Sequence, residues 1–359
     1  MTPVFGCQIF LALFFVVLFF RGRVFGAVSF RALSCRLLFF PGRAFSGRVF
    51  RGCVSGAHGF GRGVCGGRAV LVAVLLSVPA GVVFPAGASG SAVGAPLKLA
   101  TWNMGWLTSR PAGDPGLPDG IYRRNDADIE RLAAYADRLD ADIIGFQEVD
   151  GAAIAARVFR APRYRIIMSG DHVTQQTGVA IRGSLSVTVH PPVTALNVYP
   201  PSAPHPLRSG LDITVSDGTA SLRLLVIHLK TGCYDNPWTE RQHACPTLKS
   251  QFAVLDDWAL ERSDSGEAFA ILGDFNRRMT PGDPFFLSLT RDTPLLLTTS
   301  GRASPCWGGE YFIDHILLGG PARDWLTAGS LRVMTYHDPG ITPAQLSDHC
   351  PVSVRLALP

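Results

Sequence analysis

Six hydrophobic runs in the chain end in side chains that bind metal ions or transfer protons. They are LKLATWNMGW with Asn103, ADIIGFQEVD with Glu148, LRLLVIHLKTG with His228 and Lys230, AFAILGDFNRR with Asp274 and Asn276, YFIDHILL with Asp314, and AQLSDHCPVSV with Asp348 and His349. A strand inside a sheet rarely holds charged groups unless they face a site, because a buried and unpaired charge is costly. Six such strand ends therefore predict one shared cleft.

Three of these residues offer oxygen ligands for a hard divalent metal ion. They are Asn103, Glu148 and Asp348. Such ligands suit Mg²⁺, with Mn²⁺ as the alternative, and either ion offsets charge on a phosphate group and on a departing oxygen. The pattern predicts a metal-assisted hydrolysis of a phosphate ester.

The other polar residues have the chemistry that such a hydrolysis needs. Asp274 is predicted to align and deprotonate water, and Asn276, two residues on along an extended segment, to donate to a phosphoryl oxygen. An imidazole held by a carboxylate, His349 with Asp314, binds developing negative charge. His228 is predicted to protonate the leaving group.

Basic and aromatic residues near these motifs have two interpretations each. Lys230, Arg277 and Arg208 are weaker candidates for contact with the substrate phosphate, and the alternative is a side chain that simply lies in water. His315 follows Asp314 on a strand, points to the opposite face and is predicted to be structural. Four tryptophans are candidates for stacking on bases at the cleft rim, with core packing as the alternative for at least two: Trp102, Trp106, Trp238 and Trp307.

Charge is distributed unevenly along the 359 residues. Residues 1–113 contain 11 of the 33 Lys and Arg residues and none of the 28 Asp and Glu residues. The formal net charge of +5 therefore comes from the N-terminal third, and residues 114–359 are mildly acidic. A basic overall composition is no argument for nucleic-acid binding here, and an acidic body weighs mildly against tight binding of duplex DNA.

The N-terminal third resembles targeting sequence more than a packed domain. Residues 3–20 are uncharged and long enough for a membrane span or a signal core, and residues 24–67 show no sustained helix or strand period. We predict a low-order extension over 1–67, or a start codon assigned too early, followed by a signal peptide over 68–88 with a small-residue cleavage site at 86–88. The mature protein would be secreted and span 89–359; the alternative is a membrane anchor at 3–20.

Four cysteines fall in the predicted mature part, which agrees with export. They allow three connectivities, of which we favour Cys233–Cys245, because the loop is short, and Cys306–Cys350, because their strands adjoin. No CxxC pair occurs among them, which disfavours a zinc site.

From Pro96 onward, strand-like runs alternate with helical patterns, which predicts one α/β domain. Helices are expected at 126–139 and 247–261, and loops at 191–206 and 280–284. Strands are expected at 97–103, 142–147, 164–168, 178–182, 211–215, 222–229, 268–274, 312–318 and 351–356.

The motifs and their order resemble the endonuclease/exonuclease/phosphatase superfamily, which shares its fold with pancreatic-type deoxyribonuclease and the apurinic endonucleases. The resemblance covers residues 96–359 and implies a four-layer α/β/β/α sandwich, with two mixed sheets face to face and helices outside. The HLK motif with His228 is similar to the deoxyribonuclease and sphingomyelinase branches. Gly105 stands where apurinic enzymes have a second acidic metal ligand, so their metal geometry is not expected here.

The resemblance also assigns roles to the motif residues. TWN and QE supply the metal-site residues Asn103 and Glu148, and Asp348 completes that cluster. GDFN supplies the water-orienting Asp274 and the phosphate-binding Asn276, while Asp314 of IDH orients His349 of SDH.

These observations lead to a secreted Mg²⁺-dependent phosphodiesterase, with a nuclease acting on extracellular DNA as the leading hypothesis. The alternative is a lipid-directed, sphingomyelinase-like phosphodiesterase or an inositol-phosphate phosphatase. A non-enzymatic surface-binding protein is disfavoured by the full polar set. We expect a monomer whose partner is a phosphate-ester substrate and that has no obligate protein partner.

Overall fold

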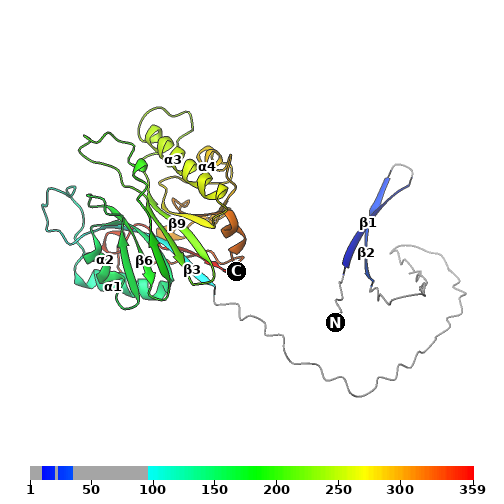
Figure 1. The fold of residues 1–359 in the computed structure, drawn as a ribbon, viewed down its shortest axis with the longest axis horizontal. Coiled ribbons are helices and arrows are strands. Elements are labelled where there is room, and N and C mark those ends of the chain that lie inside the picture. Colours follow the sequence, from blue (N-terminus) through cyan, green and yellow to red (C-terminus); the bar gives the residue numbers. More distant parts are fainter. Residues whose placement is uncertain (1–9, 21–22, 35–95) are drawn as a thin grey trace, which may run out of the picture. The chain divides into compact units, whose positions relative to one another are not determined.

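The structure is a computed structural model that describes residues 10–20, 23–34 and 96–359 (Figure 1). In the N-terminal part, β1 (Phe10–Phe20) pairs antiparallel with β2 (Arg23–Ser34). These two strands fall within residues 1–67, for which a low-order extension, or a start codon assigned too early, stays a prediction. The predicted signal peptide at 68–88 and the remainder of 1–67 lie outside the described residues. Among the residues described, no helix combines the length and hydrophobicity needed to cross a bilayer.

Residues 96–359 contain two mixed sheets of six strands each. The first sheet has the order β13 (Arg332–Val333), β14 (Val352–Leu356), β3 (Leu97–Leu107), β4 (Ile143–Val149), β6 (Gln176–Arg182) and β5 (Tyr164–Met168). The second has the order β11 (Leu295–Leu297), β12 (Asp314–Gly319), β10 (Phe269–Asp274), β9 (Ser221–His228), β8 (Leu211–Ser216) and β7 (Ser186–Val189). In each sheet the two central strands, β3 with β4 and β9 with β10, are parallel, and their neighbours are antiparallel.

Helices cover the outer faces of both sheets. Apolar residues of α1 (Asp126–Leu139) and α2 (Ala152–Val158) pack on the first sheet in a core that includes Trp102. On the second sheet, α3 (Cys245–Asp264) and α4 (Pro284–Leu289) do the same. Figure 1 shows the two helix pairs on opposite sides of the sheets.

A third core lies between the sheets. The strands β3 and β4 contribute Leu99 and Ile143, which belong to the same buried cluster as Val226 and Leu272 of the second sheet. Gly145 allows a close approach of the sheets, since a Cβ there would lie 3.1 Å from Leu272 Cδ1 and 3.2 Å from Val226 Cγ1. The layers are therefore helix, sheet, sheet and helix, which confirms the predicted sandwich.

The helix boundaries follow local signals. Helix α1 matches its prediction, because Asn125 and Asp128 form a capping box at its start. Helix α4 begins inside the segment predicted as a loop, at 280–284: the Asp283 side chain accepts from the Phe286 N–H, and Pro284 suits the first helical turn. The short elements α2, β7, β11 and β13 were not predicted, since two to seven residues give too little periodicity.

Both predicted disulfides are confirmed. Cys233–Cys245 closes a separation of 12 residues ahead of α3, and Cys306–Cys350 closes one of 44 residues next to β14. The second bridge joins two segments that are distant in sequence.

Replacing either cysteine pair by serine should destabilise the protein, because each bridge restricts the unfolded chain. We expect each paired replacement to lower the free energy of unfolding by about 2–5 kcal/mol, with the larger loss for Cys306–Cys350 because its loop is longer. Chemical denaturation of the two double variants and of wild type measures the difference. Peptide mapping of the non-reduced protein is the control, and free thiols at all four positions would contradict the prediction.

Candidate active site

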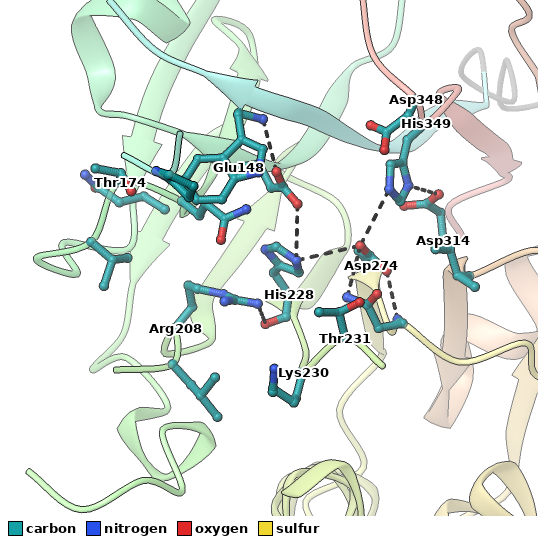
Figure 2. Close-up of a pocket in the computed structure, with 18 of the residues that line it drawn as sticks. Glu148, Thr174, Arg208, His228, Lys230, Thr231, Asp274, Asp314, Asp348 and His349 are labelled. Carbon is teal, nitrogen blue, oxygen red and sulfur yellow. Dashed lines mark hydrogen bonds and ion pairs between the residues drawn. The ribbon is translucent and has the colours of Figure 1, made fainter. Parts of the chain in front are cut away.

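The carboxyl ends of the central parallel strands meet at one edge of each sheet, where they open into a cavity of about 1800 Å³. Figure 2 shows His228 and Asp274 at its centre, with Glu148 to one side and the His349–Asp314 pair to the other. Most of the predicted site residues line it: Glu148, Arg208, His228, Lys230, Asp274, Asn276, Asp314, Asp348 and His349.

Strand register in the second sheet sets three of these residues in one row. Asp274 at the end of β10 pairs with His228 of β9 on one side and with Asp314 of β12 on the other. The preceding Gly273 has φ +145°, and a Cβ there would lie 2.0 Å from the Ile227 carbonyl oxygen. Only glycine lets the end of β10 lie this close to β9.

Irregular backbone in the first sheet turns Glu148 toward the cavity. The ladder between β3 and β4 shifts register after Asn103, and that between β4 and β6 shifts after Phe146. Glu148 itself has φ +60°, a conformation that is unusual for a side chain of its size. The Trp106 N–H donates to Glu148 Oε2 at 3.0 Å and fixes the carboxylate. These shifts have the effect of a bulge, which redirects a side chain at a strand end.

Asn103 connects the two sheets. Its side chain is fully buried, and Nδ2 donates to Asp274 Oδ2 at 3.0 Å and to Glu148 Oε1 at 3.2 Å. The oxygen of the same amide accepts from the Gly105 N–H at 2.9 Å. One amide therefore sets the distance between two carboxylates, Glu148 of the first sheet and Asp274 of the second.

Asp274 is held at both oxygens. Its Oδ1 accepts from the Asn276 backbone N–H at 2.8 Å, and its Oδ2 accepts from Asn276 Nδ2 at 3.2 Å. Burial raises the pKa of Asp274 to about 7, against the charge of His349, which lowers it; the nearby charges of Asp314 and Glu148 act in the same direction as burial. This pKa suits a group that accepts a proton at neutral pH.

Asn276 lines the cavity and positions Asp274. Its side-chain N–H groups donate to Asp274 and to the Leu229 carbonyl oxygen, the latter at 3.1 Å. Both amide hydrogens are engaged within the protein in this structure, and the contact of Asn276 with a phosphoryl oxygen stays a prediction.

The predicted pair of His349 and Asp314 is present. His349 Nδ1 lies 2.7 Å from Asp314 Oδ2, and its Nε2 faces Asp274 Oδ2 at 3.9 Å. Burial lowers the pKa of His349, but the charge of Asp314, its hydrogen bond and the charge of Asp274 outweigh burial and hold the pKa well above the ordinary value. At neutral pH this ring is a cation.

His228, in contrast to His349, is neutral. Its Nε2 lies 3.6 Å from Glu148 Oε1 and 3.7 Å from Asp274 Oδ2. Burial nevertheless holds the pKa of His228 well below its ordinary value, and the positive charges of Arg208 and His349 act in the same direction. Protonation of a leaving group by His228 requires a charged ring, which this environment disfavours. In this structure His228 is a neutral ring.

The basic candidates divide into two groups. Lys230 and Arg208 line the cavity, and Arg208 Nη2 is anchored by the carbonyl oxygens of His228 and Leu229 at 3.1 and 3.0 Å. Arg277 is buried outside the cavity lining, where it forms an ion pair with Asp283. The structure therefore does not bring Arg277 to the phosphate site, because a buried guanidinium requires a partner of its own.

Two further residues have structural and supporting roles. His315 is buried and lies within hydrogen-bond distance of Thr299 Oγ1 and the Arg277 carbonyl oxygen, as its predicted structural role requires. Tyr336 was not predicted: its hydroxyl donates to the His349 carbonyl oxygen at 2.7 Å and accepts from the indole N–H of Trp102 at 2.9 Å. No sequence signal marks Tyr336, since it lies in a segment without helix or strand period.

A family model and solved structures match this chain. Residues 100–349 match the Endonuclease/Exonuclease/phosphatase family. The chain belongs to this family. Truncated TDP2 from Caenorhabditis elegans is similar in structure, with a TM-score of 0.50 and 16% identity over 73% of this chain and 98% of that one. The 3' phosphatase NExo from Neisseria, bound to a product DNA hairpin, has a TM-score of 0.46 and 16% identity over 73% of this chain and 100% of that one. No curated protein sequence matches the chain.

As a member of the Endonuclease/Exonuclease/phosphatase family, the protein is a metal-dependent hydrolase of phosphate esters. Two groups of side chains have donor atoms within 4.8 Å of one another: Glu148, His228 and Asp274, and then Asp274, Asp314 and His349. Two buried atoms in these groups, His228 Nδ1 and Asp314 Oδ1, lack a hydrogen-bond partner in the structure. Crowded carboxylates beside unpaired donors and acceptors fit a divalent cation.

The predicted metal ligands differ in their placement. Glu148 belongs to one of these donor groups. Asp348 lines the cavity but is exposed and belongs to neither, and Asn103 turns its amide nitrogen, not its oxygen, toward the carboxylates. The hydrogen bond from Gly105 to the Asn103 oxygen is the physical reason.

Replacing Asp314 by Asn should lower the pKa of His349, because burial then acts with less opposition. In wild type the raised pKa means that stability from the charged ring is complete below the ordinary value of 6.5 and is lost as pH rises through the folded-state pKa. We expect Asp314→Asn to lose this decrease in stability at alkaline pH. An NMR titration of the His349 ring protons measures the pKa of His349 in wild type and in Asp314→Asn, with the exposed Asp324→Asn as the matched control. Equal His349 pKa values in wild type and Asp314→Asn would refute the charge assignment.

Proposed function

We propose that the protein is a secreted, monomeric phosphodiesterase that hydrolyses DNA with the aid of Mg²⁺ or Mn²⁺. The observation that carries the proposal is that a carboxylate and a cationic imidazole face each other in the cavity. Asp274 Oδ2 and His349 Nε2 lie 3.9 Å apart, the pKa of Asp274 is raised to about 7, and the pKa of His349 is held well above its ordinary value, so that the ring is charged at neutral pH. A proton acceptor and a fixed positive charge are what the attack of water on a phosphodiester requires.

The residues of the chain divide the reaction between them. Asp274, positioned by Asn276 and Asn103, takes a proton from water as the water oxygen bonds to phosphorus. The bond from phosphorus to the leaving oxygen breaks, and that oxygen keeps the bonding electron pair and takes up a proton from solvent in the open cavity. The charged His349 stabilises the negative charge that develops on the phosphoryl group. His228 stays a neutral ring and donates a hydrogen bond to the leaving oxygen.

Two sources of positive charge would neutralise the negative charge of the substrate. Arg208 and Lys230 supply positive charge from the cavity wall. A divalent ion held by Glu148 and Asp274 would neutralise further charge on the phosphate. Figure 2 shows Arg208 and Lys230 near His228.

The surface around the cavity favours a nucleic acid over a lipid. Among the described side chains, the exposed large aliphatic ones are Val189, Leu260 and Leu287, and these lie outside the cavity lining. The lining instead contains aromatic rings such as Trp106 and Tyr199, beside basic groups. Aromatic and basic side chains together are typical of sites for unpaired nucleic acid.

Secretion is supported by the two disulfides, which persist mainly in oxidising compartments. The signal-peptide pattern at 68–88 in the sequence points the same way. N-terminal sequencing of the exported protein, expected to begin near Ser89, tests this part of the proposal.

Replacing Asp274 by Asn should remove the proton acceptor and keep the shape of the side chain. We expect turnover on single-stranded and plasmid DNA to fall about 10²–10⁴-fold, while the thermal unfolding curve stays cooperative. Asp324→Asn is the matched control, because Asp324 is an exposed carboxylate away from the cavity. Wild-type protein is assayed in parallel on RNA, sphingomyelin and inositol polyphosphates. Hydrolysis of one of these in place of DNA would overturn the DNA assignment, and full activity of Asp274→Asn would overturn the site.

Removing divalent ions should abolish hydrolysis, because the crowded carboxylates then repel the phosphate. We expect EDTA to stop the reaction and added Mg²⁺ or Mn²⁺ to restore it, measured as release of nucleotides from DNA. Restoration by Zn²⁺ alone would contradict the preference for hard oxygen ligands.

A further inference from the structure

Exposed aromatic rings gather at the cavity. Among the described residues, five aromatic side chains are notably exposed: Tyr122, Tyr234, Trp238, Trp307 and Tyr311. Three of them, Tyr234, Trp307 and Tyr311, line the cavity that contains the catalytic groups. Exposed apolar surface that concentrates at one cavity indicates a ligand with apolar surface of its own.

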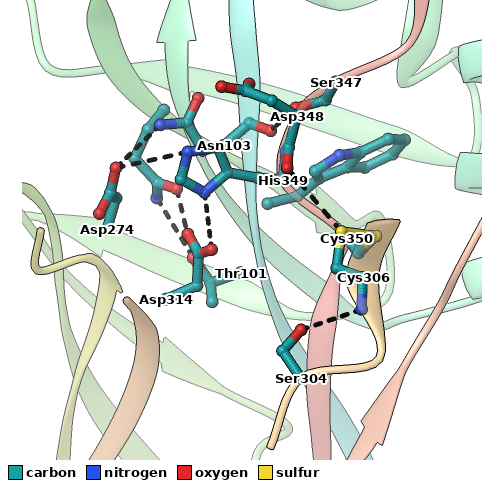
Figure 3. A network of polar contacts seen from close by, with 12 residues as sticks. Thr101, Asn103, Asp274, Ser304, Cys306, Asp314, Ser347, Asp348, His349 and Cys350 are labelled. Carbon is teal, nitrogen blue, oxygen red and sulfur yellow. Dashed lines mark hydrogen bonds and ion pairs between the residues drawn. A yellow bond between two sulfur atoms is a disulfide. The ribbon is translucent and has the colours of Figure 1, made fainter. Parts of the chain in front are cut away.

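Trp307 is held more firmly than an exposed side chain usually is. Its backbone lies in the left-handed region at φ +45°, and Gly308 and Gly309 follow with φ +104° and φ +97°. The neighbouring Cys306 is joined by a disulfide to Cys350, the residue after His349 (Figure 3). A non-glycine residue in this conformation is costly, and such strain persists where the surrounding structure imposes it.

The indole ring is fixed as well as the backbone. Its N–H donates to the Ser347 carbonyl oxygen at 2.8 Å. Its ring lies against Tyr336, with centroids 5.4 Å apart, and Tyr336 in turn donates to the carbonyl oxygen of His349. The ring is therefore anchored to the segment that carries His349, yet 39% of Trp307 remains exposed.

We propose that Trp307 is a stacking platform for an unpaired nucleobase of the nucleotide whose phosphate lies at Asp274 and His349. A rigid, exposed indole matches the flat ring of a nucleobase. A base inside a duplex already stacks on both neighbours, so the platform takes a base from a single strand or a frayed end. The net acidic charge of residues 114–359 agrees with a single-stranded substrate, because tight binding of duplex DNA relies on many contacts between basic side chains and phosphates. This inference rests on the proposed function, whose substrate it narrows.

Binding to a hydrolysis-deficient protein tests the platform directly. In an Asp274→Asn background, the Kd of a short single-stranded DNA is compared with that of the same strand carrying one abasic residue, moved through each position in turn. We expect Trp307→Ala to raise the Kd of the intact strand about 5- to 150-fold. At one abasic position the same substitution should have no further effect, as a double-mutant cycle requires.

Matched variants separate stacking from a change in fold. Trp238 is also 39% exposed and lies outside the cavity, so Trp238→Ala should leave the Kd unchanged. Trp307→Phe keeps a flat ring and should retain most of the affinity, whereas Trp307→Leu should lose it. This pair carries the test if the thermal unfolding curve shows that Trp307→Ala does not fold.

The outcomes distinguish this inference from the proposed function. An unchanged Kd for Trp307→Ala or Trp307→Leu, or an equal loss at every abasic position, overturns the platform while DNA binding stands. Stronger binding to duplex than to single-stranded DNA overturns the preference for unpaired bases. Absence of DNA hydrolysis by wild type, together with absence of DNA binding by Asp274→Asn, overturns the proposed function itself.

Discussion

The side-chain amide of Asn103 donates to a carboxylate from each sheet, and the geometry of the site depends on this contact. A neutral donor holds Glu148 and Asp274 close together without cancelling their charge, which a lysine or arginine in the same place would do. The two carboxylates remain available to a cation and to water. Close packing of the sheets at Gly145 fixes the separation that the amide bridges. The positions of the reacting groups thus depend on how the two sheets pack against each other.

Two imidazoles flank Asp274 at similar distances and carry different charge. Nε2 of His228 and Nε2 of His349 lie 3.7 and 3.9 Å from the same oxygen. Only His349 has a carboxylate, Asp314, within hydrogen-bond distance of its other ring nitrogen, whereas Nδ1 of His228 has no partner among the described residues. One neighbour therefore decides which ring holds a proton. The site keeps a cation where negative charge develops and a neutral ring beside Arg208, where a second cation would be repelled.

The sequence reveals most of the fold and of the site because the polar motifs directly follow hydrophobic strands. Parallel central strands bring such ends to one edge, so the meeting of His228 with Asp274 could be predicted. The sequence shows that Arg277 is charged but not that Asp283 engages it, and it shows the amide of Asn276 but not that both of its hydrogens are used. Tyr336 lies in a segment without periodicity. These features depend on contacts between loops, which composition and spacing do not specify.

A disulfide holds the backbone at each of two rims of the cavity. The loop after Cys233 is closed by its disulfide to Cys245, and Arg277 also donates to the carbonyl oxygens of Cys233 and Asn236 at 2.9 and 2.8 Å. The strained turn after Cys306 has its disulfide to Cys350 and the hydrogen bond from the Trp307 N–H to the Ser347 carbonyl oxygen at 2.8 Å. A reductant would remove the covalent bond at both rims and leave the hydrogen bonds, while the strand-borne carboxylates stay in place. Thiol chemistry in the surroundings would therefore act on the rims of the cavity before it acts on the reacting groups.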